Sequence, residues 1–436
     1  MSKLEELIQK LCPKGVEYKP LNNVVKSIST GLNPRKNFTL NIEGATNFYV
    51  TVKEITTGKI VFSDKTDKIT DEALDIIQDR SNLESGDILL SGIGTIGKVA
   101  LVDIPIGNWN CSESVFLIKP KNDVITSAFL AHILGSKNVQ KFFQGKARGS
   151  TLKGIRQQDL KQLKIPVPPI EVQEEIVRIL DKFTELTAEL TAELTARKKQ
   201  YEFYRDQLLS FNGINDTTNN RTGGGYNHLL NCQVKWVRLG DLALVTKLAG
   251  FEFTKYVKYS NAGQIIALRG LNVKNGQLDL TDVKYIDESD LSKLDRSKLK
   301  KGDLLFTYVG TVGQVALINE DEKFYLAPNV ALIRITNEGV LPDYLRYYCQ
   351  SNIFYKKEIL RLIQASSMQN IPMEKIRKFV VPVPPIEEQK RIVAILDRFD
   401  KLCNDISEGL PAEIEARQKQ YEYYRDKLLT FEEIAQ

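Results

Sequence analysis

Two long stretches of the chain place apolar residues three, four or seven positions apart. The first stretch contains Ile176, Leu180, Phe183, Leu186, Leu190, Leu194, Tyr201, Tyr204 and Leu208, and the second contains Ile392, Leu396, Phe399, Leu402, Ile406, Leu410, Ile414, Tyr421, Tyr424 and Leu428. This spacing predicts the seams of two long amphipathic helices. Proline residues before Ile170 and Ile386 predict an extended arm ahead of each helix, and Gly409 with Pro411 predicts a break in the second.

A different pattern precedes each helix. Short apolar or alternating runs, at residues 48–52, 59–62, 87–90, 99–102 and 115–118, are separated by Gly, Asn, Asp and Pro. This pattern is typical of strands joined by turns. Helical spacing also predicts a short helix at residues 1–12 and another at residues 127–139, the latter followed by a polar loop at 145–151. The first domain is therefore predicted to be a β-rich α+β unit.

The chain is a tandem duplication. The phrase IPVPPIEVQEEIVRILDKF at 165–183 returns as VPVPPIEEQKRIVAILDRF at 381–399, and residues 196–211 match residues 416–431 at 12 of 16 positions. The motifs that begin at Gly86 and Gly94 return at Gly302 and Gly310, an offset of 302 − 86 = 310 − 94 = 216 residues. This period is far too long for a solenoid repeat. The same β core is therefore predicted twice, although the loops between these landmarks differ almost completely.

These patterns predict an α+β fold with pseudo-twofold tandem symmetry, in which two β-rich domains are separated by two long antiparallel helical regions. The predicted boundaries are a first domain with its N-terminal helix at 1–163, a central helical region at 164–211, a flexible linker at 212–233, a second domain at 234–379, and a C-terminal helical region at 380–436. The linker is rich in Asn, Thr and Gly.

Composition narrows the class of protein. The chain has 436 residues, 42% of them hydrophobic, and a formal net charge of +5, which permits a nucleic-acid partner without requiring one. The five cysteines are scattered and never form a CxxC pair, so we expect free thiols rather than disulfides or a zinc site. Only His132 and His228 are available for a histidine-based metal centre. No apolar run approaches the ~20 residues of a membrane span, and we expect a soluble, cytoplasmic protein.

One glycine-rich stretch resembles a nucleotide-binding loop. Residues 92–98 (GIGTIGK) satisfy both GxGxxG and GxxxxGK, but residue 99 is Val and the following residues read as a strand rather than a helix. In the duplicate, Tyr308 replaces Gly92 and Gln314 replaces Lys98, whereas the glycines at 94 and 97 are retained at 310 and 313. The retained pair predicts a tight turn, not a phosphate site.

We find no catalytic constellation in the sequence. The Pro-Pro pairs at 168–169 and 384–385 lack the polar and aromatic neighbours of an amino-methyltransferase loop, and Pro342-Asp343 lacks the acidic-x-Lys partner of a nuclease. Polar and basic loop residues instead suggest binding to phosphates and base edges. The candidates for DNA contact are Asn33, Arg35, Lys36, Thr51, Lys53, Lys146, Arg148, Ser150, Thr151 and Lys153 in the first domain, and Lys247, Lys255, Arg269, Gln364, Ser366, Ser367, Gln369 and Asn370 in the second.

Similarity is distributed unevenly between the two halves. The two domains share a scaffold but differ in their loops, so we expect them to read two different DNA sequences. The two helical regions are nearly identical, so we expect them to dock two copies of one partner as well as to pack against each other. The seam positions assigned to this packing or docking are Ile176, Leu180, Phe183, Leu190, Leu194, Tyr201, Tyr204, Ile392, Leu396, Phe399, Tyr421 and Tyr424.

This arrangement resembles the specificity subunit (HsdS) of type I restriction-modification enzymes over essentially the whole chain. The resemblance is carried by the Pro-Val-Pro-Pro-Ile-Glu phrases at 166–171 and 382–387 and by the Gln-Tyr-Glu-aromatic-Tyr-Arg-Asp phrases at 200–206 and 420–426. The tandem TAEL repeat at 187–190 and 191–194 is similar to that of the type IC subfamily. The long linker and the break at 409–411 depart from exact twofold symmetry.

The resemblance implies a non-catalytic reader of double-stranded DNA with a bipartite, asymmetric target. It implies binding to two methyltransferase subunits (HsdM) and to restriction subunits (HsdR), with helices that act as a ruler and as the docking surface for HsdM. No cofactor is expected in this chain, since S-adenosylmethionine, ATP and magnesium belong to the partner subunits. Two alternatives stay open on the residues alone: a coiled-coil adaptor whose β domains bind peptides or nucleic acid, and a nucleotide-dependent enzyme.

Overall fold

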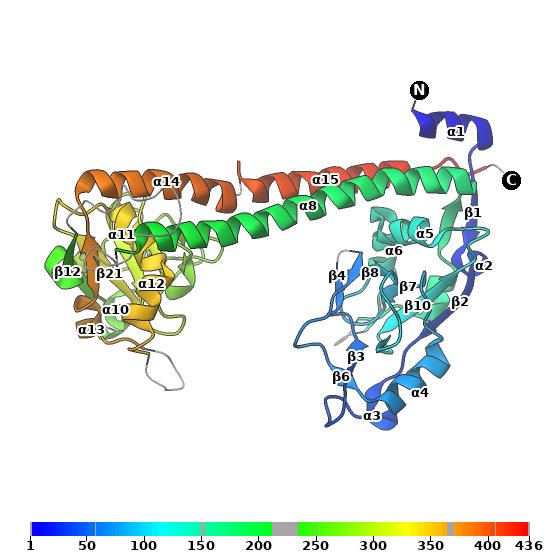
Figure 1. Cartoon of the computed structure of the whole chain (residues 1–436), viewed down its shortest axis with the longest axis horizontal. Helices are drawn as coiled ribbons and strands as arrows, with labels where there is room; N and C mark the ends of the chain where they lie inside the picture. The colour runs from blue at the N-terminus through cyan, green and yellow to red at the C-terminus, as the bar shows by residue number, and fades with distance from the viewer. Residues whose placement is uncertain are drawn as a thin grey trace, which may run out of the picture. The chain divides into compact units, whose positions relative to one another are not determined.

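The computed structural model describes residues 2–56, 58–149, 153–211, 234–248, 250–363, 370–405 and 407–434, with only the backbone described for residues 35, 36 and 252 (Figure 1). The chain divides into two compact units, residues 1–191 with 413–436 (unit 1) and residues 192–412 (unit 2). Each unit therefore combines one β-rich domain with part of both helical regions. The predicted linker at 212–233 lies outside the described residues.

Unit 1 begins with helix α1, whose Ser2 and Glu5 form a reciprocal capping box. Its helices are α1 (Lys3–Leu11), α2 (Leu21–Val24), α3 (Pro34–Asn37), α4 (Asp71–Ser81), α5 (Ser127–Gly135), α6 (Lys137–Lys146), α7 (Gln157–Lys161), the first part of α8 (Ile170–Leu209) and most of α15 (Leu410–Leu428). Its strands are β1 (Glu17–Pro20), β2 (Val25–Thr30), β3 (Asn47–Val50), β4 (Ile55–Thr56), β5 (Lys59–Ile60), β6 (Lys68–Ile69), β7 (Ile88–Ser91), β8 (Val99–Leu101), β9 (Trp109–Cys111), β10 (Val115–Pro120) and β11 (Lys164–Val167).

Unit 2 repeats this order from the end of α8 onward. Its strands are β12 (Lys235–Arg238), β13 (Ala243–Lys247), β14 (Ile266–Leu268), β15 (Val273–Lys274), β16 (Gln277–Leu278), β17 (Lys284–Tyr285), β18 (Leu304–Thr307), β19 (Val315–Leu317), β20 (Phe324–Leu326), β21 (Val330–Ile335) and β22 (Val380–Val383). Its helices are α9 (Leu239–Leu242), α10 (Gly250–Tyr256), α11 (Pro342–Gln350), α12 (Asn352–Phe354), α13 (Met373–Arg377) and α14 (Ile386–Asn404), with 3₁₀ turns η2 (Gly270–Asn272), η3 (Leu291–Lys293) and η4 (Asp295–Ser297) and a π-helical turn η5 (Tyr355–Ile359).

The same four-stranded antiparallel sheet is built in both units. Its order is β2-β10-β7-β8 in unit 1 and β13-β21-β18-β19 in unit 2. Every residue of β7 and of β18 is buried, because alternate side chains enter core clusters on opposite faces of the sheet. Burial on both faces explains why these strands appear in the sequence as continuous apolar runs instead of alternating ones.

The second layer of strands is also repeated in the two units, including segments whose sequences do not match. The three-stranded sheets β6-β3-β9 and β17-β14-β20 correspond strand by strand. The small hairpins β4-β5 and β15-β16 also correspond, since Gly58 bridges Ala100 and Gly276 bridges Ala316. The segments between the repeated landmarks therefore fold alike in part, although their sequences differ almost completely. Helix α4 has no helical counterpart among the described residues of unit 2, where the turns η3 and η4 follow β17.

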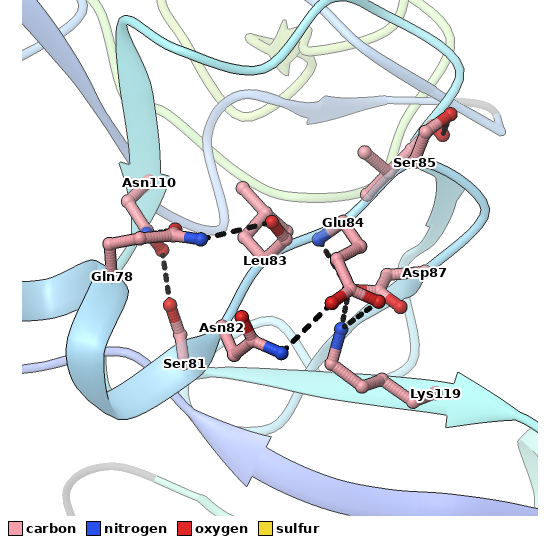
Figure 2. A network of polar contacts seen from close by, with 10 residues as sticks. Gln78, Ser81, Asn82, Leu83, Glu84, Ser85, Asp87, Asn110 and Lys119 are labelled. Atoms are coloured by element: carbon pink, nitrogen blue, oxygen red, sulfur yellow. Dashed lines mark hydrogen bonds and ion pairs between the residues drawn. The ribbon is translucent and has the colours of Figure 1, made fainter.

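Both units have a buried ion pair at the Gly-Asp phrase, which directly precedes β7 in unit 1 and β18 in unit 2. In unit 1, Lys119 Nζ donates to Asp87 Oδ2 at 2.8 Å and lies 3.2 Å from Glu84 Oε2 (Figure 2). Burial raises the pKa of the Asp87 carboxyl, and the hydrogen bond from Lys119 opposes that rise. In unit 2, Arg334 Nε donates to Asp303 Oδ1 at 2.8 Å. The repeated aspartate is therefore a structural residue of the sheet.

The same network continues to the end of helix α4. Asn110 Nδ2 donates to Gln78 Oε1 at 2.8 Å, and Ser81 Oγ donates to Asn110 Oδ1 at 3.1 Å (Figure 2). Gln78 Nε2 in turn donates to the carbonyl of Leu83 at 3.1 Å. Because Asn110 lies in β9, these side chains connect the helix to the three-stranded sheet.

A buried glutamine connects each β-rich domain to its helix. Gln173 Oε1 accepts from the backbone N–H of Thr126 at 2.9 Å, and Gln173 Nε2 donates to the carbonyls of Val124 and Pro168. Gln389 repeats this pattern with Leu341, Gly339 and Pro384. Both glutamines are fully buried. The repeated PVPPIExQ phrase therefore stabilises each domain on its own helix.

The helical seams pair reciprocally. In unit 1 the ring of Phe183 stacks on Tyr424 with centroids 5.3 Å apart, and in unit 2 the equivalent Phe399 stacks on Tyr204 at 5.8 Å. Each unit thus takes the beginning of one repeated helical region and the end of the other. Helix α14 ends at Asn404 and α15 begins at Leu410, so the second region is interrupted around the predicted break.

Helix boundaries differ from the prediction at one place. The helix predicted at 127–139 is two helices, α5 and α6, because Ser136 adopts an extended backbone conformation (φ −68°, ψ 152°).

 The helix α6 that follows runs to Lys146, into the loop predicted at 145–151. Ser136 makes no side-chain cap hydrogen bond to α6, and that role falls to Asp426 of helix α15. Within the described residues, no helix is both long and apolar enough to cross a membrane.

Candidate nucleic-acid interface and partner-docking face

One end of the four-stranded sheet gathers the loop residues of each unit. Thr30, Phe116, Leu90 and Val99 lie in register across unit 1, as Lys247, Ala331, Phe306 and Val315 do across unit 2. Beyond this register the chain turns from β7 into β8 and from β18 into β19, and it enters the short helices α3 and α10. We call this end of the sheet, with the loops that follow it, the reading edge of each unit.

The glycine-rich stretch forms a tight turn at the reading edge. Gly94 and Gly97 have φ of +83° and +90°, and Gly310 and Gly313 have φ of +80° and +91°. These left-handed conformations favour glycine. The N–H of Gly97 donates to the carbonyl of Ser91 at 3.0 Å, and Gly313 donates likewise to Thr307 at 2.9 Å. The prediction of a structural turn is confirmed.

The lysine of this stretch has a structural role. Lys98 Nζ donates to the carbonyl of Val52 at 2.8 Å, which holds the segment after β3 against the turn. In unit 2, Gln314 Oε1 accepts from the backbone N–H of Asn275 at 3.1 Å and holds the β15-β16 hairpin. Lys98 and Gln314 therefore replace each other as anchors, which a phosphate-binding lysine would not allow.

A second loop packs against the turn in each unit. In unit 1 the N–H of Gly94 donates to the carbonyl of Lys153 at 2.9 Å, and Ile155 donates to Gly92 at 2.9 Å. In unit 2, Val309 bridges Asn370, and Ile371 donates to the carbonyl of Tyr308 at 2.9 Å. The loops predicted to contact DNA thus meet the glycine turn through backbone hydrogen bonds.

Several predicted contact residues of unit 1 are placed at this edge. Lys53, Arg148 and Lys153 are exposed. Asn33 donates to Glu113, and Thr51 Oγ1 donates to Glu54 Oε2 at 2.7 Å, so both already have protein partners. Lys146 lies 3.9 Å from Asp159. The side chains of Arg35 and Lys36, and the residues Ser150 and Thr151, lie outside the part of the chain that the structure describes.

The predicted residues of unit 2 fall into two groups. Lys247 and Lys255 are exposed, and Lys247 Nζ lies 5.4 Å from the ring centroid of Tyr308 at the start of the turn. Arg269 is held by Asp282, with Nη2 3.0 Å from Oδ1, and it supports the loop after β14. Asn370 is exposed beside the turn. Gln364, Ser366, Ser367 and Gln369 lie outside the described residues. A role in DNA binding stays a prediction for both units.

The seam residues face the interior of each unit. Of the seam residues assigned to packing or docking, Ile176, Leu180, Tyr201, Ile392 and Leu396 are buried and the others are partly buried. Two further predicted seam residues, Leu186 and Leu402, are 37% and 38% exposed. Burial raises the pKa of Tyr201 to about 12, so its phenol stays neutral. These positions are occupied by packing within the chain. A partner that docks on these helices would therefore have to contact other residues of them.

Two exposed positions recur in both helical regions. Phe203 and its equivalent Tyr423 are 58% and 62% exposed, although each belongs to the most similar part of the repeat. Lys199 and Glu202 are exposed on the same helical face as Phe203, and Lys419 and Glu422 are exposed beside Tyr423. We call each triplet a docking face. The residues Phe203 and Tyr423 were not predicted, although they are the shared aromatics that fall off the seam spacing.

Among the described residues, no group of His, Cys, Asp and Glu side chains is arranged to hold a metal ion. Two long stretches, residues 13–197 and 233–416, match a family model described as the type I restriction modification DNA specificity domain. The chain belongs to this family. Each match begins at one β-rich domain and ends within the helical region that follows.

One curated relative matches nearly the whole chain, and another matches about three fifths of it. A Haemophilus influenzae protein described as a type I restriction enzyme specificity subunit is 30% identical over 95% of this chain and 96% of its own length. The EcoR124I/EcoR124II specificity subunit of Escherichia coli is 35% identical over 62% of this chain and 64% of its own length. A chain solved in work on complex assembly in a type I restriction-modification system has the same fold, with a TM-score of 0.59, 20% identity, and coverage of 96% of this chain and 98% of that one.

The predicted family and the predicted α+β tandem fold are therefore confirmed. Membership of this family also confirms the prediction of a non-catalytic specificity subunit of a restriction-modification system. The alternative of an adaptor outside restriction-modification is not supported. The domain boundaries and the individual site residues stay predictions.

Proposed function

We propose that this specificity subunit reads a bipartite, asymmetric target in double-stranded DNA, with unit 1 reading one half-site and unit 2 the other. The single observation that carries the proposal is the reading edge, which is built on the same sheet register in both units but presents different side chains. Unit 1 presents Lys53, Arg148 and Lys153, whereas unit 2 presents Lys247 and Lys255. Cationic and polar side chains on a common scaffold suit phosphate contacts, and different loops suit different base sequences.

We further propose that the two docking faces bind two copies of the methyltransferase subunit (HsdM). Many of the positions shared by the two helical regions are already explained by packing within the chain. The buried glutamines and aromatic seams account for the inward-facing part of the repeated phrases. The exposed Lys-Glu-aromatic triplets have no such explanation, and an aromatic anchor with a polar rim is typical of a protein interface. Two equal faces suit two equal partners.

The catalytic chemistry is assigned to the partners. S-adenosylmethionine would be bound by the methyltransferase subunits, and ATP and magnesium by restriction subunits (HsdR). The chain would then supply the affinity for DNA and position the partners on it. It should bind target DNA as part of the complex, and it should not modify DNA on its own.

The test is to co-express the chain with its methyltransferase subunit in a host without N6-methyladenine and to map methylated adenines by sequencing. We expect one motif of two specified parts with an unspecified gap, and no such methylation when either protein is omitted. Exchange of residues 234–379 for the matching domain of a relative should change one half-site and leave the other. Methylation without a consistent motif, or a motif that changes in both halves, would contradict the proposal.

A further inference from the structure

Helix α10 carries an aromatic side chain, Phe251, that lies largely in solvent. Phe251 is 75% exposed, more than any other large hydrophobic side chain among the described residues. Single exposed apolar residues are common on protein surfaces, so exposure alone does not indicate a function. The surroundings of Phe251 distinguish it from such residues.

The opposite face of α10 is firmly anchored. Phe253, Tyr256 and Val257 pack against the core cluster of β14, β20 and the outer face of β18. The ring of Phe253 also contacts that of Tyr259, with centroids 5.3 Å apart. Anchoring at these positions fixes the orientation of the helix and holds Phe251 away from the protein. Because the helix is fixed, Phe251 would lose little conformational freedom on contact with another molecule.

Cationic side chains accompany Phe251. Lys255 lies one turn further along the helix and is exposed, so Phe251 and Lys255 share a face. Lys247, at the end of β13, lies just before α10 on the reading edge. Two carboxylates of the segment after β17 already have protein partners, because Asp287 Oδ1 accepts from the N–H of Gln264 at 2.9 Å and Asp290 Oδ1 accepts from Ser292 Oγ at 2.6 Å. Glu252 of α10 carries a further carboxylate. This combination favours a polyanion with apolar groups over a protein surface.

Helix α10 occupies the same place in unit 2 as α3 does in unit 1. Each follows the first strand of the four-stranded sheet and precedes the first strand of the three-stranded sheet. Helix α3 has the sequence PRKN and carries no aromatic residue, whereas α10 has the sequence GFEFTKY. The two units therefore differ at this place in the chemistry they can offer to DNA.

We propose that Phe251 contacts the C5-methyl group of a thymine in the half-site read by unit 2, while Lys255 binds an adjacent phosphate. This inference rests on the proposed DNA-reading function. A helix fits the major groove of B-form DNA, which is about twice as wide as the minor groove. The thymine methyl is the apolar group that the major groove presents, and phenylalanine is among the side chains that contact it.

The experiment uses the complex of the full chain with its methyltransferase subunits. The unit 2 half-site is first identified by exchange of residues 234–379, as above. Duplexes are then made in which each thymine of that half-site is replaced in turn by deoxyuridine, which lacks the methyl group. We expect one replacement to weaken binding of the unaltered complex by about four-fold, the effect of one buried methyl group. The Phe251→Ala complex should bind the two duplexes equally.

Leu280→Ala is the matched control, because Leu280 is an exposed apolar residue of unit 2 outside α10, and it should keep the four-fold difference. Phe251→Leu should keep part of it, which separates loss of contact from misfolding. The proposal is overturned if the half-site contains no thymine, if no replacement affects the unaltered complex, or if Phe251→Ala keeps the full difference. In each of these cases the bipartite methylation motif would persist, so the proposed function would stand.

Discussion

Oδ1 of Asp426 accepts a hydrogen bond from the backbone N–H of Lys137 at 3.0 Å. The contact joins helix α15 to the first residue of α6, and the equivalent Asp206 accepts from the backbone N–H of Asn352 at 3.1 Å. A carboxylate at a helix N-terminus satisfies an otherwise unpaired N–H and interacts favourably with the helix dipole. The repeated Tyr-Arg-Asp phrase thus attaches each β-rich domain to a helix of the other repeat, α15 for the first domain and α8 for the second.

We predict that Asp426→Ala destabilises α6 by about 1 kcal/mol, the usual cost of losing a helix cap. Asp206→Ala is the matched variant and should cost less, because the Ser351 side chain still caps α12 by accepting from the N–H of Phe354. Hydrogen exchange of the α6 and α12 amides measures both effects. Equal protection of α6 in the unaltered chain and in Asp426→Ala would contradict this prediction.

Much of the fold could be predicted because its causes are local. The apolar runs at 87–90 and 115–118 are buried on both faces of the sheet, and the glycines retained at 310 and 313 identified the turn. The break at Ser136 could not be predicted, because α6 begins where Asp426, far away in sequence, supplies its cap. The roles of the residues in the repeated phrases were only partly predictable. Gln173 and Gln389 are buried within the chain, whereas Phe203 and Tyr423 are exposed, and the sequence repeat alone does not show this difference. Contact with DNA depends on loop side chains that have no transferable code.

A second prediction concerns the attachment of the N-terminal helix. Glu175 accepts from Arg178 and lies 2.9 Å from Lys3 of α1, and these cations lower the pKa of the Glu175 carboxyl to about 2, with the Arg178 hydrogen bond as the larger cause. A lowered pKa means that the folded state favours the carboxylate. Its contribution is therefore present above the ordinary pKa of about 4.5 and is lost as pH falls from there towards 2.

The Glu175→Gln variant should lose this contribution at neutral pH. Because Lys3 and Arg178 are largely exposed, we expect about 1 kcal/mol rather than the full value of the shift. Hydrogen exchange of the α1 amides should show faster exchange in the variant at pH 6 and a smaller difference at pH 3. Glu171→Gln, at an exposed position of the same helix, is the control. A difference that grows as the pH falls would contradict the assignment.

The docking faces lead to a prediction about stoichiometry. Phe203→Ala should leave a complex with one methyltransferase subunit, Tyr423→Ala should do the same, and the double variant should bind neither, because each aromatic is the anchor of one interface. Loss of such an anchor typically costs about 2 kcal/mol or more. Native mass spectrometry counts the bound subunits directly.

Gln207→Ala is the control for this experiment, since Gln207 is exposed on the same helix but is replaced by lysine in the repeat. It should retain two partners. Full occupancy in the double variant would place docking elsewhere. A folded chain with no partner in either single variant would indicate that the two faces do not act independently.

The last prediction concerns the TAEL repeat within α8. Deletion of Thr191–Leu194 removes four residues, which shortens a helix by about 6 Å and changes its rotation by roughly 40° after one full turn. One base pair advances DNA by about 3.4 Å and rotates it by roughly 35°. Since Leu190 would take the place of Leu194 in the seam, the helix should survive. We expect the unspecified gap to shorten by about one base pair while both half-sites stay the same, as mapped by sequencing methylated adenines. Thr191→Ala keeps the length and should keep the gap, whereas altered half-sites in the deletion would rule out a role for the helix as a ruler.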